Sequence, residues 1–124
     1  MTNHNDFEKL EIPLVATLVK IYWTAHQLIF SLPKFERYTL GEKIEKAILD
    51  AIELVIIANG TNKFEKEKIL LRANAKIELL KIFHRLALNC QMIDGQKYLE
   101  IEKTLQEAGK QTQGWIKFVR NCQS

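Results

Sequence analysis

Apolar residues return every three or four positions along nearly the whole chain, and this spacing constrains the fold more than any other feature. A period near 3.6 residues is typical of an α-helix that buries one face. Only two prolines and five glycines interrupt the 124 residues, and the abundant Leu, Ile, Ala, Lys and Glu suit helices. The pattern predicts an all-α protein, and the length suits a single domain over residues 1–124 that buries its own core.

Four segments carry the helical period, and short breaks separate them. Pro33 ends the first segment because the residue before a proline avoids the α region, and Gly60 and Gly95 mark the later breaks. We expect helices at about residues 12–31, 39–59, 62–92 and 95–121. Four helices joined by short connections predict an up-down-up-down four-helix bundle.

The junction between the first two expected helices, "LPKFERYTLGEK", is unusually crowded. Thr39 is placed to cap the second helix, and Glu42 three residues later would complete a capping box. Phe35 and Tyr38 are expected to pack back onto the helix ends, which leaves Arg37 displayed at one end of the bundle. We interpret the junction as a structural corner, with Arg37 able to meet a neighbouring subunit or an RNA phosphate.

The third expected helix carries a second apolar flank besides its core stripe. At 100° per residue this flank lies well away from Ile77 and Leu80. Either two neighbouring helices cover both faces, as for a fully buried helix, or another copy of the chain covers the surplus surface. We favour an oligomer interface, and its predicted residues are Leu79, Phe83, Leu86 and Cys90.

Basic residues form rows at helical spacing on the last two expected helices. Lysines of the last helix recur every seven residues opposite its core stripe, and the third helix carries two pairs spaced by four. Such rows can neutralise successive phosphates, in keeping with a net charge of +3. A solvated surface is the alternative, since glutamates interleave with the lysines. The candidate binding residues are Arg72, Lys76, Lys81, Arg85, Lys103, Lys110, Lys117 and Arg120.

No pattern in the sequence predicts catalysis, a cofactor or a metal site. His84 falls on a core stripe, where a packed histidine is commoner than a general base. His26 has no carboxylate or nucleophile at a defined spacing, and Cys90 and Cys122 lack ligands at metal-binding distance in sequence. We therefore expect no enzyme activity and reduced thiols. Without an apolar signal segment or a run long enough to span a bilayer, we expect a soluble cytoplasmic protein with no membrane partner.

Three blocks stand in order along the chain, and they are "LPKFERYTLGEKIEKAILDAIELVIIA", "LLRANAKIELLKIFHRLA" and "EAGKQTQGWIKF". Together they cover most of residues 12–118. They resemble the family of small four-helix proteins that includes the accessory variability determinant (Avd) of diversity-generating retroelements. The resemblance implies a non-enzymatic protein that forms a homopentameric barrel of bundles. It also implies binding to the retroelement's reverse transcriptase and, through a basic surface, to template-repeat RNA.

Two features depart from the family pattern. Gln113 stands where the family places the first of two glycines before the tryptophan, which bears on the packing around Trp115. The second expected helix is rich in acidic residues. The sister group encoded in ribosomal-RNA intervening sequences therefore stays an alternative, as an assembly protein without a nucleic-acid partner whose lysines maintain solubility. Under the Avd interpretation there are two candidates for the RNA contacts. Analogy with the family favours Arg72 and its neighbours, whereas helical spacing favours the lysine row of the last helix.

Overall fold

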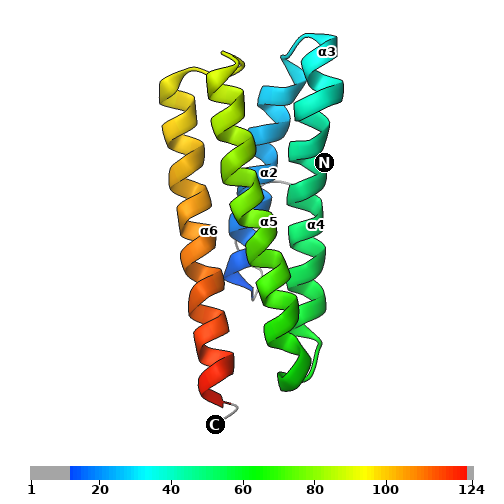
Figure 1. Cartoon of the computed structure of the whole chain (residues 1–124), viewed down its shortest axis with the longest axis vertical. Coiled ribbons are helices and arrows are strands. Elements are labelled where there is room, and N and C mark those ends of the chain that lie inside the picture. The colour runs from blue at the N-terminus through cyan, green and yellow to red at the C-terminus, as the bar shows by residue number, and fades with distance from the viewer. Residues whose placement is uncertain (1–11, 123–124) are drawn as a thin grey trace.

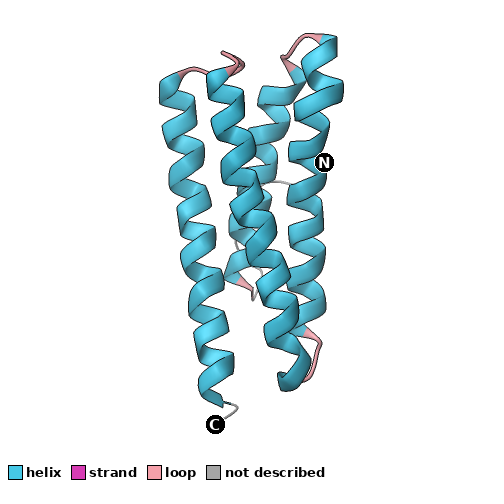
Figure 2. Cartoon of the chain, in the orientation of Figure 1, coloured by secondary structure: helices cyan, strands magenta, loops and turns pink. Residues whose placement is uncertain are grey.

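The computed structural model of the protein describes residues 12–122. Over this range, helices dominate the chain and the connecting loops are short, as Figure 2 shows. Successive long helices run in opposite directions, and the last packs back against the first (Figure 1). The long helices of this range are α2 (Pro13–Phe30), α4 (Glu42–Asn59), α5 (Lys63–Asn89) and α6 (Gly95–Cys122). The prediction of an all-α four-helix bundle is confirmed for the described residues.

Local chemistry explains most of the helix boundaries. Pro13 begins α2, where its missing N–H costs no hydrogen bond. Asn62 caps α5, because its Oδ1 accepts hydrogen bonds from the backbone N–H groups of Phe64 and Glu65 at 3.1 Å. After α5 the backbone of Gln91 takes the left-handed conformation, with φ of 60°, which is a common way for a chain to leave a helix.

The core runs along the bundle axis and draws on every long helix. A second cluster at the lower end in Figure 1 joins α4, α5 and α6, and its members are Ala58, Leu70, Ile116 and Val119. His84 is only 1 % exposed, and its Nδ1 lies 2.7 Å from the backbone oxygen of Leu80, so the ring donates to the preceding turn. The prediction that His84 is a packed core residue is confirmed.

The start of the second helix differs from the prediction. The helical chain begins at Lys34, where α3 (Lys34–Glu36) leads through a π-helical turn, η1 (Arg37–Gly41), directly into α4. Thr39 thus lies inside a helical turn, and its Oγ1 donates to the backbone oxygens of Phe35 and Glu36 at 3.0 and 3.3 Å. The predicted capping box is wrong because the chain is already helical directly after Pro33, so that no helix start is left at Thr39.

The aromatic residues of the junction do not pack onto the helix ends as predicted. Phe35 is 76 % exposed and Tyr38 is 62 % exposed. Gly41 makes the close contact instead, since a Cβ there would lie 2.9 Å from Cγ2 of Ile29. The buried Leu32 and the half-buried Leu40 cover the end of the core. The corner is therefore closed by small and aliphatic residues, which leaves the aromatic rings at the surface.

Candidate nucleic-acid interface

A polar cleft of about 460 Å³ lies between α5 and α6 on the outside of the bundle. We call it the α5/α6 groove. Its lining combines two lysines, one glutamate, three amide side chains and one glycine. The lining residues are Asn74, Glu78 and Lys81 of α5 and Gln106, Gly109, Lys110 and Gln113 of α6.

Helical spacing on two neighbouring helices builds this groove. On α5 the lining residues follow one another at intervals of four and three, and on α6 at intervals of three, one and three, so that each set forms one stripe. Gly109 provides a floor without a side chain, and a Cβ there would lie 3.5 Å from Nζ of Lys81. The ammonium group of Lys81 therefore lies above the backbone of α6, although it belongs to α5.

The groove contains one more positive than negative charge. Nζ of Lys81 donates to Oε1 of Glu78 at 3.1 Å, and its side chain is 29 % exposed. Lys110 is exposed and makes no ion pair with any residue of the described range. The ammonium groups and the N–H groups of the amides are the kinds of donor that phosphate and ribose oxygens accept from.

Several predicted binding residues meet along the seam between α5 and α6. Lys81 and Lys110 line the same groove. One turn beyond Lys81, Arg85 donates from Nη1 to the hydroxyl of Tyr98 at 3.3 Å. Towards the other end of the seam, Nε of Arg120 lies 3.2 Å from Oε1 of Glu67. In the structure, basic residues of α5 and of α6, which the sequence shows as two separate rows, therefore lie along the same seam.

Lys103 and Lys117 lie on the exposed face of α6 on either side of Lys110. Lys103 also borders a smaller cleft of about 260 Å³ towards α2, which Lys20 lines from the opposite helix. The lysine row therefore follows the outside of α6, and its middle member enters the α5/α6 groove.

The remaining basic candidates lie elsewhere. Nζ of Lys76 is 3.5 Å from Oδ2 of Asp50 across the α4/α5 contact, and Arg72 lies one turn before Lys76 on the same flank. A hydrogen bond from Lys46 lowers the pKa of Asp50, and the charge of Lys76 adds to this effect. The pair Arg72 and Lys76 is therefore separate from the α5/α6 groove.

Arg37 caps a helix end. Its Nη2 donates to the backbone oxygen of Phe30, the last residue of α2, at 3.2 Å and to that of Leu32, in the loop that follows, at 3.1 Å. A role of Arg37 in RNA or subunit contacts stays a prediction.

Sequence reasoning missed the amide residues of the groove. Asn74, Gln106 and Gln113 carry no charge, and no pattern of charges marks them. Their only signal is that each belongs to a polar stripe at helical spacing on α5 or α6. That the two stripes form one groove can be recognised only when the two helices are known to be neighbours.

The predicted oligomer flank keeps apolar surface in the isolated chain. Leu86 is 44 % exposed and Cys90 is also exposed. Leu79 is half-buried, and Phe83 packs partly against the core. Ile82 of the same helix is 56 % exposed. An interface at this flank stays a prediction.

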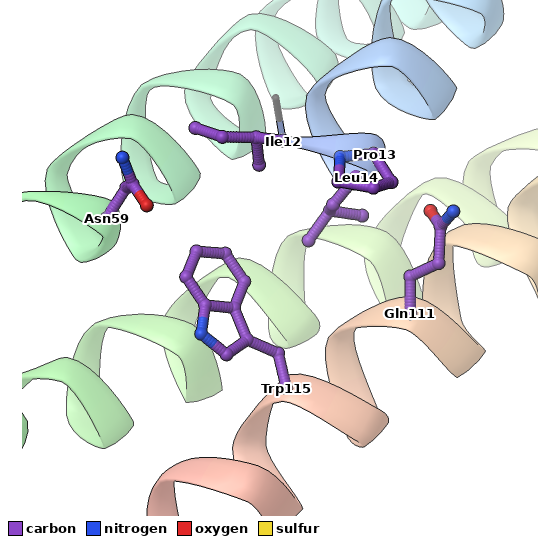
Figure 3. A pocket seen from close by; sticks show the side chains of 6 residues that line it. All are labelled: Ile12, Pro13, Leu14, Asn59, Gln111 and Trp115. Atoms are coloured by element: carbon purple, nitrogen blue, oxygen red, sulfur yellow. The ribbon is translucent and has the colours of Figure 1, made fainter. Parts of the chain in front are cut away.

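A different cleft, of about 400 Å³, opens at the start of α2 (Figure 3). The indole ring of Trp115 extends from α6 towards Ile12 and Asn59, and it packs against two of the core clusters. None of the residues that line this cleft is charged. Gln113, which replaces a glycine of the family pattern, lines the α5/α6 groove. It therefore lies on a different face of α6 from Trp115 and does not border the Trp115 cleft.

The family model described as bAvd-like matches residues 15–119. This range takes in most of each long helix, the α5/α6 groove and the α2–α4 junction. The comparison with curated proteins yields no match. Within residues 12–122, no helix combines the length and the apolarity that a membrane crossing requires.

Proposed function

Because the chain belongs to the bAvd-like family, we propose that it is a scaffold of a diversity-generating retroelement that binds template-repeat RNA along the α5/α6 groove. Membership implies a non-catalytic accessory role and an association with the element's reverse transcriptase. In this role the protein would hold the RNA beside the reverse transcriptase during mutagenic reverse transcription. The variable cDNA would then diversify a target gene.

One observation carries the proposal for the RNA site. Lys81 and Lys110 come from different helices and line one polar groove, and Lys103 and Lys117 continue the positive charge along α6. Lysines in a row release counterions from phosphates when they bind, so affinity follows the number of contacts and falls with salt. Amide groups beside them contact phosphate or ribose oxygens and position the strand without reading its bases.

Self-association would multiply this surface. We propose that copies of the chain meet through the apolar flank of α5 and form a homopentamer, as the family resemblance implies. Exposed apolar side chains on that flank support the proposal. Each copy would then present one groove, and binding of one RNA by several grooves would raise the overall affinity without any new kind of contact.

Binding to a structured template-repeat RNA tests this proposal. Lys81→Glu/Lys110→Glu should weaken binding at least tenfold, because it removes two phosphate contacts and adds repulsion. It should also reduce the slope of log affinity against log salt concentration. The expected reduction is about 0.7 to 0.9 for each of the two lost contacts. Fluorescence anisotropy over a salt series measures both quantities, with the oligomer mass followed in parallel.

The matched control is Lys43→Glu/Lys68→Glu, which makes the same change of charge on α4 and α5 outside the groove. It should change the affinity less than threefold. Equal losses in both double variants would contradict a localised site and point to net charge alone. Absence of RNA binding by the wild type at every salt concentration would favour an assembly protein without a nucleic-acid partner.

A further inference from the structure

The α2–α4 junction exposes an unusual concentration of aromatic surface. Phe30, Phe35 and Tyr38 are 72 %, 76 % and 62 % exposed, although they lie within nine positions of one another. Exposed apolar patches of this kind mark interaction sites in many proteins, and aromatic residues are enriched at the centres of protein interfaces. The patch lies at the end of the bundle where α3 is labelled in Figure 1, and no residue of the α5/α6 groove belongs to it.

A cleft of about 330 Å³ lies beside these rings. Three segments contribute to it, and the lining residues are His26, Ile29 and Phe30 of α2, Arg37 and Tyr38 of η1, and Glu42 and Glu45 of α4. The π-helical turn and the close contact of Gly41 with Ile29 hold these segments together. Isolated π-helical turns are frequent at functional sites. We call this cleft the junction cleft.

The junction cleft has an excess of negative charge. Oε1 of Glu45 lies 2.6 Å from Nδ1 of His26, whereas Glu42 forms no ion pair within the described residues. The guanidinium of Arg37 is engaged by the carbonyls of Phe30, at the negative end of α2, and of Leu32 in the loop that follows. The cleft is therefore lined by two carboxylates, of which that of Glu45 is bound by His26, and by one guanidinium that is already bound, in a chain whose net charge is +3.

Arg37 also shows that an aromatic ring of the cleft binds a guanidinium group. Its guanidinium carbon lies 5.6 Å from the centre of the Phe30 ring, a distance at which a cation is attracted to an aromatic face. Tyr38 also lines the cleft, and no cation lies over its ring in the described structure. A planar cation that enters the cleft meets an aromatic wall and two carboxylates.

We propose that the junction cleft binds an arginine side chain presented by a partner protein. The guanidinium would pair with the carboxylates of Glu42 and Glu45 through charge-assisted hydrogen bonds and lie against the ring of Tyr38. RNA does not fit the same cleft, because its phosphates would face two carboxylates. The inference rests on the proposed function only for the identity of the partner, which would be the reverse transcriptase.

A fluorescent octa-arginine peptide is the probe for the cleft itself. Glu42→Gln/Glu45→Gln and Tyr38→Ala should each raise its Kd at least fivefold, and octalysine should bind more weakly than octa-arginine, because lysine lacks the planar group. The matched controls are Glu53→Gln/Glu107→Gln and Phe118→Ala, which make the same changes at other exposed sites. Equal losses in the controls, or no preference for arginine, would overturn the proposal.

The purified reverse transcriptase of the same retroelement then identifies the partner. The cleft variants should lose its binding at least fivefold while they keep the affinity for RNA, the oligomer mass and the melting temperature of the wild type. A change in oligomer mass would instead assign the cleft to a second copy of the chain and overturn the proposal. If the wild type binds octa-arginine at the cleft but does not bind the reverse transcriptase, the proposed function fails and the arginine site stands.

Discussion

At the scale of single residues, His84 combines burial with an incomplete set of hydrogen bonds. Its Nδ1 donates to Leu80, while Nε2 is buried without a partner among the described residues. Burial lowers the pKa of His84 below its usual value of 6.5, and this effect outweighs the hydrogen bond to Leu80 and the charge of Glu102. The ring is therefore neutral in the folded protein at pH 7.

This predicts a loss of stability in mild acid. Below about pH 6.5 the unfolded chain takes up a proton on His84 that the folded chain binds only at lower pH, so the free energy of unfolding falls as the pH falls through this range. Urea unfolding at pH 7.5 and 5.5 measures the difference. His84→Leu should reduce it. An undiminished difference in His84→Leu would contradict this account.

Gly41 is the second residue with a specific steric role. A methyl group there would lie 2.9 Å from Ile29 and 3.2 Å from the backbone oxygen of Glu36. Gly41→Ala should therefore lower the free energy of unfolding by about 1 to 3 kcal/mol, the usual cost of overpacking. The control is Gly114→Ala in α6, where the added methyl group would have no neighbouring atom within 4 Å. Because alanine favours the helix over glycine, this change should stabilise the protein by roughly 1 kcal/mol. Thermal unfolding distinguishes the two, and equal effects would refute the steric argument.

At the scale of elements, α6 was largely predictable and the junction was not. The three-four spacing of α6 predicts both its core stripe and its lysine row, because both depend on one helix. The junction contains a sequence that matches a capping box, yet Pro33 starts the helix earlier and a π-helical turn follows. Spacing within one helix also cannot reveal Asn74 or Gln113 as parts of a groove, since that depends on which helices are neighbours.

The apolar flank of α5 gives a prediction at the same scale. Leu86→Lys places a charge on this flank at a side chain that is 44 % exposed, so the fold should tolerate it while self-association should weaken. For Leu86→Lys, size-exclusion chromatography coupled to light scattering should report a mass near that of one chain, 14.4 kDa. Leu99→Lys, at a side chain of α6 that is 67 % exposed, should leave the mass unchanged. The interface prediction fails if the two variants behave alike.

At the scale of the whole molecule, the bundle separates its surfaces. The α5/α6 groove runs along one side, the apolar flank lies on another face of α5, and the junction cleft lies at one end. Each surface depends on different helices or different faces of one helix. RNA binding, self-association and protein binding should therefore respond to separate substitutions.

The central claim is that RNA lies along the α5/α6 groove, and photo-crosslinking tests it most directly. Template-repeat RNA that carries 4-thiouridine is irradiated with the intact protein, and mass spectrometry locates the attached peptides. The account predicts crosslinks concentrated on the peptides that contain Lys81 and Lys110. Crosslinks concentrated instead on the flank of Arg72 and Lys76, or on the junction of α2 and α4, would contradict it.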